Sequence, residues 1–94
     1  MKTSLTEQDI LDKIVGEEYQ HFNNKNTICV LTLQNGFQVE GWAGKVDPKD
    51  FNPKIGEQVS KKRAIDKLWL LEGYLLQETL YKLDYFNDNK LQTQ

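Results

Sequence analysis

One stretch decides the fold: residues 27–43, which read TICVLTLQNGFQVEGWA. Its first seven residues are apolar and rich in β-branched side chains, a composition typical of a strand. Asn35 and Gly36 form the centre of a hairpin turn, because both residue types tolerate the positive φ that a type I′ turn requires at its two central positions. The pattern therefore predicts a β-hairpin over residues 27–44. Its two-residue loop pairs Thr32 with Val39, Val30 with Gly41 and Ile28 with Ala43, and Phe37 completes their apolar face.

The opposite face of this hairpin is also too apolar to be left in water. It carries Cys29, Leu31, Leu33 and Trp42, together with Gln38 and Glu40. An isolated two-stranded ribbon is marginally stable, so both of its faces need cover. A third strand, a helix of the same chain or another subunit could supply this cover, and we expect a homo-oligomer.

A helical pattern precedes the hairpin. Ile10, Ile14 and Val15 fall on one helical face within residues 5–22. Ser4 followed by Glu7 matches a capping box, in which each side chain accepts a hydrogen bond from the other's backbone N–H. We therefore expect a helix over residues 5–22.

A second helical pattern follows the hairpin and a loop at residues 45–52. Asn52 followed by Pro53 is typical of a helix start, and apolar residues then recur at steps of three and four as far as residue 86. This region forms one helix, or two if Ser60 caps a second one, and residues 87–94 form a frayed tail. The expected fold is α+β in a single domain, residues 1–94: an N-terminal helix, the hairpin with its Asn-Gly turn, and a long C-terminal helix packed on the hairpin.

Composition limits the setting of the protein. The chain has 94 residues and a formal net charge of −2, with a pI near 5.3, so we expect no binding to polymeric nucleic acid. Cys29 is the single cysteine, which favours a reducing cytosol. No window approaches the roughly 18 apolar residues of a membrane span, and we expect no membrane association.

Enzyme signatures are missing from the chain. His21 is the single histidine, and Cys29 lies in an apolar run without a second cysteine nearby, so neither a histidine-cysteine metal site nor an activated thiol is expected. The sequence contains no phosphate-binding glycine loop, no GxSxG elbow and no HExxH helix. We therefore expect no enzyme activity, no metal and no cofactor.

Residues of the second helical region carry the candidate ligand chemistry. Glu72 lies within an apolar stripe one turn after Trp69, where it either pairs with a lysine or accepts hydrogen bonds from a ligand. Gly73 leaves room for another backbone or a ligand. Arg63 and Lys67 share a helix face, which is either a solvated basic face or a place where a phosphate bridges them. The candidate ligand-binding residues are Trp42, Arg63, Lys67, Trp69, Glu72 and Tyr74, whose aromatic members are either core residues or platforms for a stacked base.

The order of motifs resembles a known family over residues 27–80. The motifs are LxNGF at residues 33–37, Pro48, Phe51 and Gly56, Ala64, and LWLLEGYLL at residues 68–76. They resemble the gene-product-forty-nine-like family of small accessory proteins of tailed bacteriophages. The resemblance implies a phage protein that acts in the host bacterial cytoplasm, and it implies no catalytic residue.

Three functions for a non-enzymatic phage-encoded protein remain open. The first is a counter-defence factor that sequesters a small nucleotide-type immune signal of the host, in a pocket between subunits. The second is an inhibitor that uses the face around Trp42 to block a host defence protein. The third is an accessory role in the virion or in its assembly. The first of these rests on analogy with other small phage proteins rather than on a motif.

Overall fold

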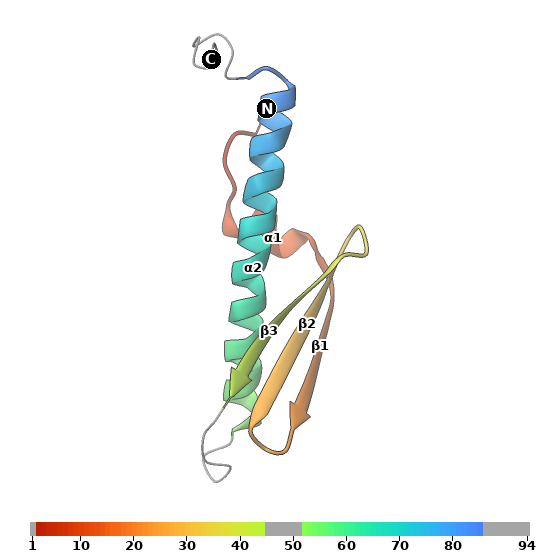
Figure 1. The fold of residues 1–94 in the computed structure, drawn as a ribbon, viewed down its shortest axis with the longest axis vertical. Helices are drawn as coiled ribbons and strands as arrows, with labels where there is room; N and C mark the ends of the chain where they lie inside the picture. The colour runs from red at the N-terminus through yellow and green to blue at the C-terminus, as the bar shows by residue number, and fades with distance from the viewer. Residues whose placement is uncertain (1, 45–51, 86–94) are drawn as a thin grey trace.

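The computed structural model describes residues 2–44 and 52–85, which form the expected α+β fold (Figure 1). The elements are α1 (Glu7–Asp12), β1 (Ile14–Phe22), β2 (Asn26–Leu33), β3 (Gln38–Gly44) and α2 (Pro53–Lys82). The strands make one antiparallel sheet in the order β1-β2-β3. α2 packs along one face of this sheet and continues beyond it (Figure 1).

The N-terminal helix is short, and the prediction of a helix over residues 5–22 is wrong beyond Asp12. The Thr6 hydroxyl accepts a hydrogen bond from Asp9 N (3.1 Å), and the Asp9 carboxylate accepts one from Thr6 N (2.8 Å). The capping box therefore consists of Thr6 and Asp9 rather than Ser4 and Glu7. The predicted capping motif is therefore present, but it lies two residues later in the chain.

Residues 14–22 form a strand because β2 offers them a pairing partner. β1 is an edge strand. Its inward-facing residues Glu17, Tyr19 and His21 make polar and charged contacts, and the ring of Tyr19 also packs against the apolar core. The alternation of apolar and polar residues that marks a half-buried strand is therefore missing. Strand pairing thus overrides a weak helical pattern.

The hairpin loop contains three residues, 34–36, rather than two. Leu33 N donates a hydrogen bond to Phe37 O (2.8 Å), and Gly36 N donates one to Leu33 O (2.8 Å). Gly36 has a φ of 92°, as predicted, whereas the predicted positive φ at Asn35 is wrong. The Asn35 side chain instead accepts a hydrogen bond from Phe37 N (3.0 Å). A glycine in the left-handed region that closes the turn is the usual form of a three-residue hairpin loop.

The extra loop residue shifts the predicted register by one and exchanges the two faces of β2. Leu31, rather than Thr32, pairs with Val39, and Cys29 pairs with Gly41. The buried face of the sheet therefore carries Thr27, Cys29, Leu31, Leu33, Val39 and Ala43. Ile28, Val30, Trp42 and Phe37, by contrast, are not in the core. The sequence analysis expected another element to cover the face with Cys29, Leu31 and Leu33. In the structure, α2 of the same chain covers it.

The second helix starts as predicted. The Asn52 side chain accepts hydrogen bonds from Lys54 N (3.0 Å) and Ile55 N (3.4 Å), and Pro53 is the first helical residue. The helix runs unbroken to Lys82, and Ser60 caps no second helix. The predictions for the loop at residues 45–51 and for the tail at residues 87–94 lie outside the described residues.

One row of residues, spaced four apart, contains the buried positions of α2 and changes from small to large side chains along the helix. The row is Gly56, Ser60, Ala64, Leu68, Glu72, Leu76 and Leu80. At its small end, helix and sheet are in backbone contact, because a Cβ added to Gly41 of β3 would overlap Ser60 O and Ala64 N. Further along, Leu68 joins Ile10 and Leu31 in the core. The helix and the sheet diverge in this direction, so larger side chains fill the widening gap (Figure 1).

The C-terminal part of α2 extends past the sheet (Figure 1). Its 30 residues span about 45 Å, whereas the longest strand, with nine residues, spans about 30 Å. The radius of gyration is 17.8 Å, well above the roughly 12–13 Å of a compact domain of this size. Beyond the sheet, the N-terminal segment runs along one side of α2, where Leu80 is buried, and the other side is exposed (Figure 1).

Candidate functional site

The face of the sheet opposite α2 carries a stacked aromatic pair. Phe22 of β1 and Trp42 of β3 stack across the central strand, with ring centroids 6.0 Å apart and an interplanar angle of 27°. Their exposed fractions are 38% and 48%. Ile28 and Val30 of β2 lie half-buried between them and the hairpin loop. We call these four residues, with Glu18 and Glu40 beside Val30, the outer sheet face.

No element among the described residues covers the outer sheet face, which is why the aromatic rings remain open to solvent. Such a pair is a large apolar surface with a fixed geometry, because each ring limits the rotamers of the other. Glu18 and Glu40 lie beside the pair, and Lys67 of α2 forms an ion pair with Glu40. The face can therefore bind an apolar side chain or a ring.

Two of the predicted phosphate ligands have structural partners at the edge of this face. Arg63 Nη1 donates a hydrogen bond to Trp42 O (2.7 Å), and Lys67 Nζ lies 2.8 Å from Glu40 Oε2. The hydrogen bond from Lys67 lowers the pKa of Glu40 below its ordinary value. Both cations thus join α2 to β3. Trp42, Arg63 and Lys67 are thus the candidate residues that the structure brings together, and each of the two cations already has an acceptor.

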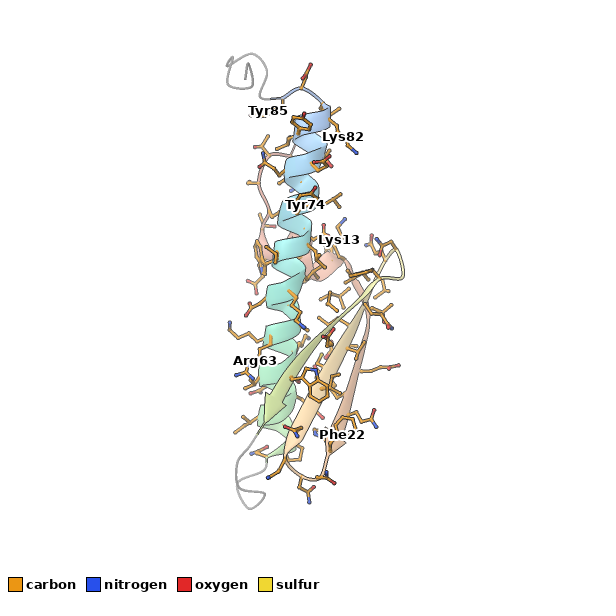
Figure 2. The ribbon with its side chains drawn as sticks, viewed as in Figure 1. Lys13, Phe22, Arg63, Tyr74, Lys82 and Tyr85 are labelled. Atoms are coloured by element: carbon orange, nitrogen blue, oxygen red, sulfur yellow. The ribbon has the colours of Figure 1, made fainter. Side chains whose placement is uncertain are left out.

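The structure places Trp69, Glu72 and Tyr74 elsewhere on α2. Glu72 lies 3.7 Å from Lys13 Nζ, the lysine pairing that the sequence left open. Trp69 lies beside Glu7 and Lys62 on one flank of the helix. At about 100° per residue, Tyr74 points away from Glu72, and it is largely exposed. Figure 2 shows Tyr74 on the part of α2 above most of the sheet and Arg63 further down the helix, at the level of the sheet. A single chain therefore does not gather the six candidate residues into one site.

A polar network between β1 and α2 was missed by the sequence analysis. The Tyr19 hydroxyl donates to Glu17 Oε2 (2.5 Å), and Lys61 Nζ lies 3.0 Å from Glu17 Oε1. These two contacts hold the pKa of Glu17 below its ordinary value. Burial raises the pKa of Tyr19, and the bond to Glu17 adds to this effect. The strand prediction for residues 14–22 would have been needed to find the network, because it depends on the inward side of β1.

His21 extends the network along β1. His21 Nδ1 lies 2.8 Å from the Thr27 hydroxyl and Nε2 lies 3.1 Å from Glu57 Oε2. Cys29, on the same sheet face, is fully buried, and this burial raises the pKa of its thiol. A nucleophilic cysteine needs the opposite, an accessible thiol with a lowered pKa. The network thus fastens the edge strand to α2.

The cavities of the described residues are small or shallow. One of about 220 Å³ lies between the ends of β2, β3 and α2, with Lys25 and Arg63 among its lining residues. It is smaller than the roughly 300–1,000 Å³ of typical ligand pockets. Residues 2–44 and 52–85 contain no group of three potential metal-ligating side chains. No helix in these ranges is long and apolar enough to cross a bilayer.

The fold and the outer sheet face define a class: a small α+β protein with one helix-covered sheet face, one open sheet face and a projecting helix end. The chain belongs to the Phage protein (N4 Gp49/phage Sf6 gene 66) family, whose model matches residues 5–80. This match confirms the predicted resemblance and extends it to α1 and β1. No curated protein and no solved structure shows a significant match.

Proposed function

We propose that this phage-family protein is a non-enzymatic inhibitor that binds a host defence protein through the outer sheet face. The observation that carries this proposal is the stacked pair of Phe22 and Trp42, half-exposed and uncovered by any described element. Tryptophan and other large aromatic residues supply much of the energy of protein interfaces, because they bury a large area at low entropic cost.

The surroundings of the pair support a protein target rather than a nucleic acid. Glu18 and Glu40 flank Val30 on the same face, and among residues 2–44 and 52–85 Lys67 forms an ion pair with the second of them. Acidic groups on the rim repel phosphates and favour basic side chains. The target surface should therefore present an apolar anchor next to lysine or arginine.

A second candidate is the sequestration of a small nucleotide-type immune signal. The cavity beside Lys25 and Arg63 favours it, because two cations there suit a phosphate. At about 220 Å³ the cavity holds a phosphate group but not a whole dinucleotide, so the base would need a surface from a second subunit. In this second candidate function, Arg63 binds a phosphate, as the sequence analysis expected.

The inhibitor proposal is tested by affinity capture from host lysate, followed by calorimetry with the purified partner. Trp42→Ala should weaken binding of that partner by about 2 kcal/mol or more, which is roughly thirtyfold or more in Kd. Trp69→Ala removes an exposed tryptophan from the flank of α2 and serves as the control, with Kd unchanged. Equal loss in both variants, or no loss in Trp42→Ala, would contradict the assignment of the outer sheet face.

The sequestration candidate is tested by titrating cyclic dinucleotides and ADP-ribose derivatives against wild type, Arg63→Ala and Glu72→Gln. A heat of binding that is measured with wild type but not with Arg63→Ala would favour a phosphate site at the cavity. Heat that is unchanged in both variants would assign the ligand to another site, and no heat with folded protein would remove this candidate.

A further inference from the structure

The C-terminal part of α2 carries an apolar surface that the fold does not use. Three large side chains on one side of this part of the helix have exposed fractions between 65% and 76%: Leu70, Tyr74 and Tyr81, which we call the helix patch. At about 200 Å² for each large side chain, these fractions amount to roughly 400 Å². That lies within the about 300–600 Å² of the largest apolar patch of a typical monomer, which is often a functional surface.

We propose that the helix patch binds a second copy of this chain, with the two α2 helices packed antiparallel. This inference does not rest on the proposed function, because the outer sheet face lies on the other side of the sheet from α2. It also relocates the expected homo-oligomer contact, since α2 already covers Cys29, Leu31 and Leu33 within one chain.

The spacing of the exposed residues favours a copy of the same helix as the occupant. Leu70, Tyr74, Gln77 and Tyr81 form one stripe with steps of four, three and four, the spacing by which paired helices interlock. The series is identical when read in the opposite direction. A twofold axis through its midpoint, between residues 75 and 76, places Leu70 opposite Tyr81 of the partner subunit. Such self-complementarity is what a twofold interface between identical subunits requires.

Gly73 supplies an independent observation. Glycine within a helix lowers stability relative to alanine, and a close contact usually explains it. At Gly73, however, an added Cβ would meet no atom of the chain within 4 Å, so nothing inside the subunit requires a glycine. Gly73 adjoins the stripe, since it is three residues from Leu70 and four from Gln77. The absent side chain lets a second helix approach closely there.

The edges of the stripe suit an interface rim. The stripe residues are uncharged, and the pair of Glu78 and Lys82 (3.8 Å) lies beside them. An apolar centre with charged pairs at its border is the usual composition of a protein interface.

The association is tested by light scattering coupled to size-exclusion chromatography. Wild type at tens of micromolar should have the mass of a dimer, and Tyr74→Glu should have that of a monomer. Val15→Glu, a similar change at a largely exposed position of β1, should remain dimeric. A monomeric wild type, or a dimeric Tyr74→Glu, would overturn the proposal.

Two further variants separate association from folding and fix the direction of the helices. Gly73→Leu has room in its own subunit, so it should melt no earlier than wild type when both are dilute, yet be monomeric. The variant with both Leu70→Cys and Tyr81→Cys should form a disulfide-linked dimer on oxidation, whereas Leu70→Cys alone should not. If Gly73→Leu were dimeric, the two helices would not approach closely at this position. If Leu70→Cys alone formed a cross-linked dimer, the helices would not be antiparallel.

Discussion

The contact between β3 and α2 makes Gly41→Ala the most informative stability variant. An added Cβ would overlap Ser60 O and Ala64 N and would lie 3.0 Å from Arg63 C. All three are backbone atoms of a helix, so no side chain can rotate away. α2 would have to retreat by about 1 Å, and a gap of this size forfeits a quarter to a half of each van der Waals contact along the row.

The expected loss follows from this geometry. Overpacking of a core costs about 1–3 kcal/mol, and the rigid backbone on both sides puts Gly41→Ala near 3 kcal/mol. For a domain of this size, that corresponds to a decrease in Tm of roughly 12–24 °C. Urea and thermal unfolding followed by circular dichroism measure both quantities, and they are run at low protein concentration so that association does not contribute.

Gly73→Ala is the matched control for Gly41→Ala. It makes the same chemical change where no atom lies within 4 Å of the new Cβ, and it should raise stability by up to about 1 kcal/mol through helix propensity. The reasoning would be refuted if Gly41→Ala cost less than about 1 kcal/mol, or if the two variants changed stability in the same direction.

Two other variants test the hairpin loop and the polar network. Gly36→Val should lower stability by more than about 1 kcal/mol, because a β-branched residue is strained at a φ of 92°. Gly36→Asn should lower stability less. Equal urea midpoints for wild type and Gly36→Val would contradict the described loop conformation. Glu17→Gln should be less stable than wild type at neutral pH. The folded-state pKa of Glu17 is held below the ordinary 4.5, so its carboxylate stabilises the fold above that pH. This contribution is lost as the pH falls through the folded-state pKa. The difference between the two proteins should therefore shrink in acid titrations below pH 4.5, and a constant difference would exclude the carboxylate as its source.

Local signals in the sequence suffice for much of the fold. Asn52 and Pro53 mark the start of α2, and the residues around Gly36 mark the hairpin. The loop length is different, because Asn-Gly fits both two- and three-residue loops and only the burial of one face against α2 decides between them. β1 escapes prediction because its inward residues Glu17 and His21 are polar and a register shift follows Ile14, so neither face of the strand shows a regular apolar pattern.

The candidate site is harder to predict for a related reason. In the sequence, Arg63 and Lys67 look like free cations on a helix face. Because β3 runs beside α2, Arg63 instead donates a hydrogen bond to Trp42 O (2.7 Å) and Lys67 donates one to Glu40 Oε2 (2.8 Å). The stack of Phe22 on Trp42 depends on two strands that are not neighbours in the sheet. No local pattern reports such contacts, since they arise from the register and from the position of the helix.

The graded row on α2 also divides the helix into parts that differ in how easily they unwind. The turns that hold Ser60 and Ala64 rest on β3, so they open only when the whole domain does. The turns near Tyr81 rest on much less of the chain, and a short helical segment is barely stable in water on its own. Fraying from this end therefore competes with any molecule that needs an ordered helix there. A bound partner would first be visible as slower hydrogen exchange of these last turns, because occupancy and helical order are thermodynamically coupled.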